Sequence, residues 1–166
     1  MKFGKLLEQS ARPDWAVNYV NYKRAKDQIK IHADIPTFKN FIQEECEKVE
    51  KFYLQTLEKV RAEGERLNNM MESTPKQGGG GSVASMVKSS WNHTEDLRFL
   101  YDFCHLNSEG IRKSLKKYDK AFKDDRDRPQ LKGDYFDGLK GRYAFFAYGD
   151  ALRTLLEQCA SFWIDV

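Results

Sequence analysis

Two groups of lysines have a spacing that places each group on one face of a helix. In an α-helix, residues three, four or seven positions apart share a face. The first lysine stripe is Lys23, Lys26 and Lys30, and the second lysine stripe is Lys113, Lys116, Lys117 and Lys120. Stacked like charges repel one another and destabilise an isolated helix, so two such stripes favour a polyanionic ligand.

The residue types beside the stripes indicate the kind of anion. Lysine is a flexible point charge rather than a rigid fork, so a lysine surface recognises charge density more than shape. Tyr22 lies four residues before Lys26 and adds a hydroxyl to the first lysine stripe. The start of the chain, at Lys2 to Gly4, adds unpaired N–H groups if a helix begins there. Several clustered phosphates are therefore favoured over one.

The charge of the whole chain is modest, so its distribution matters more than its total. The net charge is +3. Residues 1–30 carry seven basic and three acidic residues, residues 112–123 carry six and one, and residues 43–72 carry five and eight. Three functions fit: a phosphate-ligand receptor, a basic module that binds nucleic acid or anionic membrane, and a coiled-coil interaction domain. Nucleic-acid binding favours a longer basic track with exposed aromatics, whereas the aromatics here lie mostly on the apolar seams. Membrane binding favours large exposed apolar residues beside the lysines, which the second lysine stripe lacks. We therefore expect a phosphate-ligand receptor and no nucleic-acid partner.

Residues that could support catalysis or metal binding are scattered. Histidines 32, 93 and 105 have no cysteine or histidine partners at zinc-ligand spacing. Cysteines 46, 104 and 159 lie among apolar positions, which is typical of buried thiols. Residues 124–127 lack the glycine and glutamate of a calcium loop and predict a surface turn. We therefore predict no enzyme activity, no catalytic residues, no metal and no cofactor.

Two long helices must position the lysine stripes. Apolar residues recur every three or four positions from Phe38 to Met71, after a start signal at Asp34 to Pro36, and again from Leu97 to Phe122. Thr94 is predicted to open the second helix. Between them, Gly78 to Ser82 has the composition of a flexible linker, and we interpret about 76–88 as an engineered linker that replaces a native loop. The two helices are then antiparallel, with Asn107 in the seam requiring a hydrogen-bond partner and Gly110 as a point of bending.

Shorter helical segments complete an all-α prediction. Residues 2–9 and 14–31 form an N-terminal helical hairpin, while 135–143 and 144–163 form smaller C-terminal helices. The hairpin packs on the long antiparallel pair, so that both lysine stripes face a common groove. No apolar run approaches the ~20 residues of a membrane span, and the first residues lack a secretory signal. We expect a cytosolic chain, or the cytosolic face of a membrane protein if the natural chain continues past Val166.

Three separated segments carry a resemblance to a known family. They read MKFGK at residues 1–5, PDW at 13–15 followed by YVNYKRAK at 19–26, and LNSEGIRKSLKKYDK at 106–120. In this order they resemble the SPX domain. The resemblance implies a helical hairpin on two long helices within a single domain over 1–166. No family motif is found in residues 124–166.

The resemblance also implies a ligand and its contacts. SPX domains are receptors for inositol polyphosphates, such as inositol hexakisphosphate, and for inositol pyrophosphates, and they report cellular phosphate status to an attached or partner effector. The phosphate cluster of the family maps to Tyr22, Lys26 and Lys117. The lysine surface cluster maps to Lys113, Lys116 and Lys120, with Lys2 and Lys23 as additional contacts. Ala25, Asp27 and Ser114 depart from the family pattern, and Asp27 is expected to weaken affinity. The effector remains open among polyphosphate synthesis, transport, phosphodiester hydrolysis and transcription control.

Overall fold

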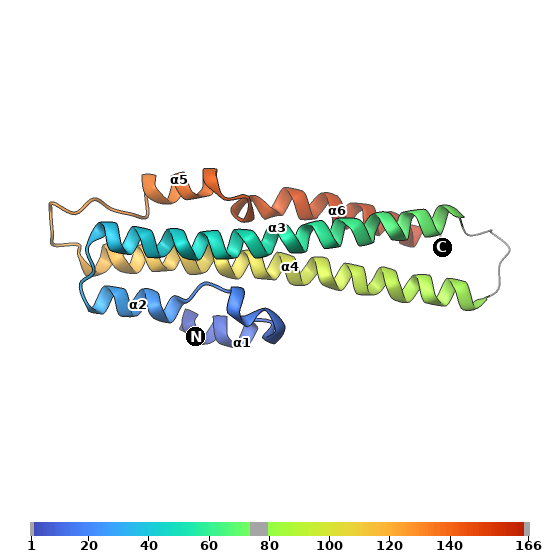
Figure 1. Cartoon of the computed structure of the whole chain (residues 1–166), viewed down its shortest axis with the longest axis horizontal. Helices are drawn as coiled ribbons and strands as arrows, with labels where there is room; N and C mark the ends of the chain where they lie inside the picture. Colours follow the sequence, from blue (N-terminus) through green and yellow to red (C-terminus); the bar gives the residue numbers. More distant parts are fainter. Residues whose placement is uncertain (1, 74–79, 165–166) are drawn as a thin grey trace. The chain divides into compact units, whose positions relative to one another are not determined.

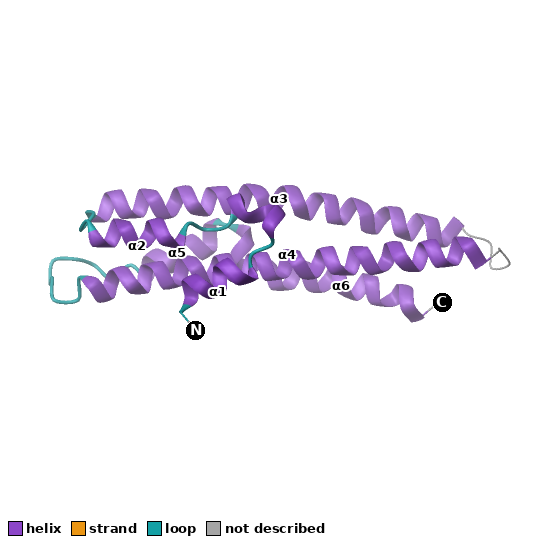
Figure 2. Cartoon of the chain, turned by 90° about the horizontal axis from the view of Figure 1, so that it is seen from below, coloured by secondary structure: helices purple, strands orange, loops and turns teal. Residues whose placement is uncertain are grey.

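The computed structural model describes residues 2–73 and 80–164, and every regular element within these ranges is a helix (Figures 1 and 2). The elements in chain order are α1 (Phe3–Ser10), the 3-10 helix η1 (Pro13–Asn18), α2 (Tyr22–Lys30), α3 (Ile35–Ser73), α4 (Gly80–Ala121), α5 (Asp134–Arg142), the 3-10 helix η2 (Ala144–Ala147) and α6 (Tyr148–Ile164). The predicted all-α class is confirmed. None of the described helices is long and apolar enough to cross a membrane.

The long helices α3 and α4 are antiparallel and pack together, as their apolar seams predict (Figure 1). The start of α3 is also as predicted. Asp34 Oδ1 accepts the backbone N–H of Thr37 at 2.7 Å, which satisfies a donor of the first turn. Gly110 does not end α4, which continues to Ala121.

The predicted start of the second long helix at Thr94 is wrong. α4 begins at Gly80, and Thr94 lies inside it, where its hydroxyl donates to the carbonyl of Ser90 at 3.0 Å. A threonine hydroxyl can satisfy the preceding turn of a helix as well as a helix start, so the sequence signal was ambiguous. Of the predicted linker at 76–88, residues 80–88 are helical, and the remainder lies outside the described residues.

The segment predicted as one helix over 14–31 is instead divided into η1 and α2. The backbone N–H groups at the break bind side chains of the long helices: Val20 N–H donates to Asn107 Oδ1 at 2.7 Å, and Asn21 N–H donates to Glu45 Oε2 at 2.6 Å. Asn21 then caps α2, because its Oδ1 accepts the N–H of Arg24 at 2.9 Å. Tertiary partners therefore overrode the local helical pattern.

The described chain forms two compact units. The first unit comprises Met1–Tyr53 and Phe103–Ala147, and the second unit comprises Leu54–Asp102 and Tyr148–Val166. Aromatic rings fill the core of the first unit, where Phe103 contacts Trp15, Tyr19 and Phe52 at centroid distances of 5.8, 4.9 and 4.9 Å. In the second unit, the buried leucines are Leu57 and Leu67 of α3, Leu97 and Leu100 of α4, and Leu152 of α6.

The C-terminal helices agree with prediction in position. α5 covers the predicted 135–143 segment, and the predicted 144–163 segment begins as η2 and continues as α6. In the first unit, Glu50 of α3 accepts the N–H groups of Ala144 and Phe145 at 2.8 and 2.9 Å, which fixes η2. The three cysteines are buried as predicted.

Candidate anion-binding surface

Residues from three helices of the first unit meet around the ring of Phe3. This ring lies edge-on to Tyr22 of α2 at a centroid distance of 5.0 Å, and Lys113 Nζ of α4 lies 5.0 Å from the Phe3 centroid. Lys26 Nζ lies 5.5 Å from the Tyr22 centroid, and a Cβ on Gly4 would come within 3.8 Å of that nitrogen. Phe3 and Gly4 of the first turn of α1 therefore lie near one lysine of each stripe, Lys113 and Lys26.

The rest of the second lysine stripe continues from Lys113 along α4. Lys116, Lys117 and Lys120 are exposed, and α4 is helical throughout this region. Lys117 follows Lys113 by one turn, a rise of about 6 Å, so the two ammonium groups share one face. Ser114, which departs from the family pattern, is buried and donates to the carbonyl of Gly110 at 2.8 Å. It takes no part in the lysine face.

A groove of about 700 Å³ adjoins the first lysine stripe between α1, η1 and α2. Its lining includes Tyr22 and all three lysines of that stripe, together with Asp27 and Lys48. Residues of the second lysine stripe are not among those that line it. A common groove for both stripes therefore stays a prediction.

Ion pairs determine which cations are available to an anion. Lys30 Nζ lies 3.3 Å from Asp27 Oδ1, and Arg112 is bound to Glu109 with an Nε to Oε1 distance of 2.7 Å. Within residues 2–73 and 80–164, no carboxylate lies within ion-pair distance of Lys26, Lys113 or Lys117. Asp27 thus compensates the charge of Lys30 rather than that of Lys26.

Tyr22 and α1 supply hydrogen-bond donors beside these lysines. Burial raises the pKa of the Tyr22 hydroxyl, so it remains protonated at neutral pH and able to donate. Lys2 is the exposed N-cap residue of α1, the first turn of which contains no acidic residue. The positive end of the helix dipole lies here, and no carboxylate of the first turn offsets it. Lys23 is exposed on α2 and lines the groove.

Buried side chains of α3 and α4 hold the start of α2 in place. Asn107 is fully buried, accepts from Val20 and donates to the carbonyl of Phe103 at 2.7 Å, which confirms the prediction that it has partners. A Cβ on Gly110 would collide with Cγ1 of Val20. Gly110 therefore permits close packing of the segment before α2. The bend of α4 at this residue stays a prediction.

Two residues of this region were missed at the level of sequence. Phe3 resembled an ordinary apolar residue of a short helix, although its place in the MKFGK segment could have singled it out. Glu45 was counted only within an acidic stretch, yet it is 7% exposed, binds Asn21 and forms a 2.6 Å ion pair with Lys48. No periodicity distinguishes such a carboxylate from a solvated one.

The residues considered for other chemistry are dispersed. His93 is buried in the second unit, whereas His32 and His105 are exposed. In the described part of the chain, no three histidine, cysteine or acidic side chains group as a metal site. Residues 124–127 are exposed, as predicted for a surface turn.

Comparisons with known proteins agree with the sequence resemblance. Residues 1–36 match the family model of the SPX domain. An SPX domain-containing membrane protein of Oryza sativa subsp. indica is 28% identical over 134 residues, covering 74% of this chain and 19% of the relative. SPX domain-containing protein 3 of Arabidopsis thaliana is 25% identical over 130 residues, covering 72% of this chain and 53% of the relative. The chain thus spans about a fifth of the length of the first of these relatives.

A solved structure shows the same fold. It is the SPX domain of Chaetomium thermophilum glycerophosphodiester phosphodiesterase 1 in complex with inositol hexakisphosphate, with a TM-score of 0.68 and 22% identity. The match covers 92% of this chain and 99% of that chain. The amino-terminal sequence, the relatives and the helical fold all agree on the SPX domain as the family to which this chain is matched.

Proposed function

We propose that this chain is a receptor for inositol polyphosphates and inositol pyrophosphates. The observation that carries the proposal is a chain of contacts at the first turn of α1. Lys113 of α4 lies over the Phe3 ring, Phe3 packs on Tyr22, and Lys26 of α2 lies over the Tyr22 ring, so cations from α2 and α4 lie near the positive end of α1. The structural neighbour with the same fold is complexed with inositol hexakisphosphate, which supports this ligand class.

Each residue has a defined role in this proposal. Tyr22, Lys26 and Lys117 form the main phosphate-binding cluster, with the tyrosine hydroxyl as donor and the two ammonium groups as charge-assisted donors. Lys113, Lys116 and Lys120 attract the remaining phosphates along α4, and Lys2 and Lys23 contribute at the edges. The chain binds without chemical turnover, and ligand occupancy is transmitted to an attached or partner effector.

Calorimetry with several anions tests the ligand class. Inositol hexakisphosphate and a pyrophosphate form should bind far more tightly than orthophosphate, which cannot bridge both helices and should bind at about the millimolar level, or ~4 kcal/mol. Affinity should fall steeply between about 50 and 200 mM salt because the lysines are exposed. Comparable binding of orthophosphate and hexakisphosphate, or tighter binding of short DNA at matched salt, would refute the proposal.

Substitutions test the placement of the site. Lys26→Ala and Lys117→Ala should each weaken hexakisphosphate binding by roughly 1–3 kcal/mol, the scale of a hydrogen bond to a charged group. Lys51→Ala removes an exposed lysine of α3 outside both stripes and serves as the matched control. Unchanged affinity in both test variants, with helicity retained, would place the ligand elsewhere.

A further inference from the structure

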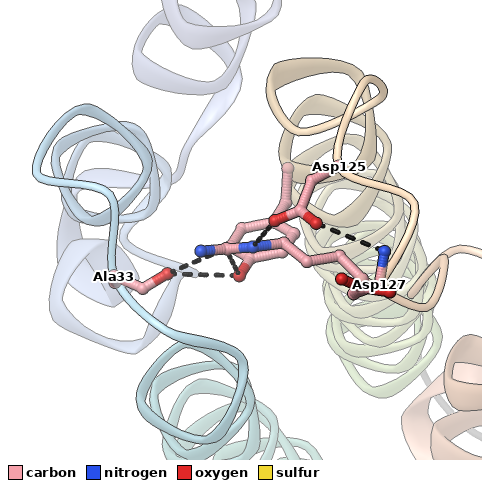
Figure 3. A network of polar contacts seen from close by, with 5 residues as sticks. Ala33, Asp125 and Asp127 are labelled. Atoms are coloured by element: carbon pink, nitrogen blue, oxygen red, sulfur yellow. Dashed lines mark hydrogen bonds and ion pairs between the residues drawn. The ribbon is translucent and has the colours of Figure 1, made fainter.

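Arg128, in the segment that follows α4, contacts both the corner between α2 and α3 and the end of α4. Its Nη1 donates to the Tyr118 hydroxyl at 2.6 Å and lies 3.5 Å from the carbonyl oxygen of Ala33. The Tyr118 hydroxyl donates to the same Ala33 oxygen at 3.1 Å. Figure 3 shows this network, in which Asp125 approaches the guanidinium from the side opposite Ala33. One planar guanidinium thus connects three separate backbone segments.

The two places that Arg128 joins adjoin the helices that carry the lysine stripes. Ala33 follows the last turn of α2, which ends at Lys30, and Tyr118 is adjacent to Lys117 on α4. The chain turns sharply between α2 and α3, because His32 has a φ of 54°, in the left-handed region. A corner of this kind fixes the direction of α2 only if tertiary contacts hold it.

The segment that carries Arg128 is itself attached to α4. Asp119 accepts the N–H groups of Leu131 and Lys132 at 2.8 and 2.9 Å. Arg128 Nε donates to Asp125 Oδ2 at 2.8 Å, and the guanidinium carbon lies 4.1 Å from the Phe122 ring centroid. The side chain is 24% exposed, so most of its donors face protein groups rather than a ligand.

We propose that Arg128 is a positioning residue for the anion-binding surface: it sets the placement of Lys26 on α2 relative to Lys117 on α4 by joining the α2–α3 corner to the end of α4. This inference rests on the proposed function, and Arg128 itself does not contact the ligand. Removing the guanidinium should lower the affinity for anions that bridge the two helices, while the weak binding of orthophosphate should be unchanged.

The test compares Arg128→Gln with Arg126→Gln. Arg126 is two residues away, is exposed and has no hydrogen bond or ion pair among the described residues, so its variant removes the same charge from the same segment. Arg128→Gln should weaken inositol hexakisphosphate binding roughly tenfold, about the effect of one well-placed hydrogen bond, while Arg126→Gln should stay near wild type. Equal affinities of the two variants would overturn the inference.

A double-mutant cycle separates positioning from an independent contact. If Arg128 places Lys117, then Lys117→Ala should cost less affinity in the Arg128→Gln background than in wild type. Additive losses would overturn the inference, since they indicate a separate charge effect. If Arg128→Gln does not fold, Tyr118→Phe takes its place in the cycle, because it removes the shared hydroxyl while keeping the ring stacked on Phe38.

Hydrogen exchange tests the structural step without a ligand. The Ala33 N–H donates to the carbonyl of Gln28 at 3.0 Å and reports on the corner. Arg128→Gln, or Tyr118→Phe, should speed exchange there, but Arg126→Gln should not. If wild type fails to bind hexakisphosphate, the proposed function fails, and unchanged exchange at Ala33 would separately overturn the positioning role.

Discussion

Replacing Asn107 by alanine should loosen the segment before α2 from the long helices. Asn107 Oδ1 accepts the N–H of Val20 at 2.7 Å, and Val20 is only 3% exposed, so water cannot readily replace the lost acceptor. The side-chain amide also donates to the carbonyl of Phe103 at 2.7 Å. Both bonds disappear in Asn107→Ala, and the Val20 N–H remains buried without a partner.

The expected cost follows from three contributions. Leaving a buried donor unpaired costs about 1–3 kcal/mol. The small cavity left by the amide adds roughly 1 kcal/mol, and the better helix propensity of alanine offsets about 0.7 kcal/mol. The free energy of unfolding should therefore fall by about 1–3 kcal/mol.

Urea unfolding followed by circular dichroism measures this change. The matched control is Asn40→Ala, which deletes the same side chain at an exposed position of α3 and should alter the free energy of unfolding by less than about 0.5 kcal/mol. The denaturant slope should be the same for both variants. A difference below about 1 kcal/mol between the two variants would refute the view that this buried amide holds the chain before α2.

Three further predictions concern packing, pH and thiol reactivity. Gly110→Ala should destabilise the protein by about 1–3 kcal/mol, because the added Cβ collides with Val20. Gly138→Ala in α5 should stabilise the protein by roughly 0.5–1 kcal/mol, because a Cβ there meets open space. Urea unfolding of both variants checks these opposite signs. Burial lowers the pKa of His93 below the unfolded value of 6.5, against the opposing effect of Glu63 and Asp96. The unfolded state therefore binds more protons than the folded state, and the free energy of unfolding should fall as the pH drops below about 6.5. Unfolding measured between about pH 5 and 7.5 should show a smaller pH dependence in His93→Gln than in wild type, and an unchanged slope would contradict this assignment. Burial raises the pKa of the Cys46 and Cys104 thiols, so both should resist iodoacetamide in the native protein and react in denaturant. Mass spectrometry measures the labelling, and rapid labelling of the native protein would contradict the burial of these thiols.

The sequence predicted the helices because their signals are local. Apolar spacing along α3 and α4 depends only on helix periodicity, and the Asp34 cap depends on a hydrogen bond to Thr37, three residues away. The stripe of Lys113, Lys116, Lys117 and Lys120 follows from the same periodicity. For these features, neighbouring residues contain the whole physical cause.

Helix boundaries were less predictable where distant groups compete for the backbone. The break between η1 and α2 depends on Asn107 and Glu45, which are far away in the sequence. Thr94 has a residue type favoured at helix starts, yet its hydroxyl bonds within α4. A local pattern cannot decide between two partners of similar energy when one of them comes from another element.

The candidate anion-binding surface depended both on the sequence and on the packing of the helices. Residue types and family motifs indicated Tyr22, Lys26 and the lysines of α4 as candidates for phosphate binding. The packing of the helices placed Phe3 against Tyr22 and Lys113, and it brought Arg128 to the Ala33 carbonyl; neither contact is visible in the sequence. Which side chains share a helix face follows from the order of residues within one helix, so it can be predicted from the sequence. Which faces meet depends on how separate helices pack, because that packing rests on contacts between residues far apart in the chain.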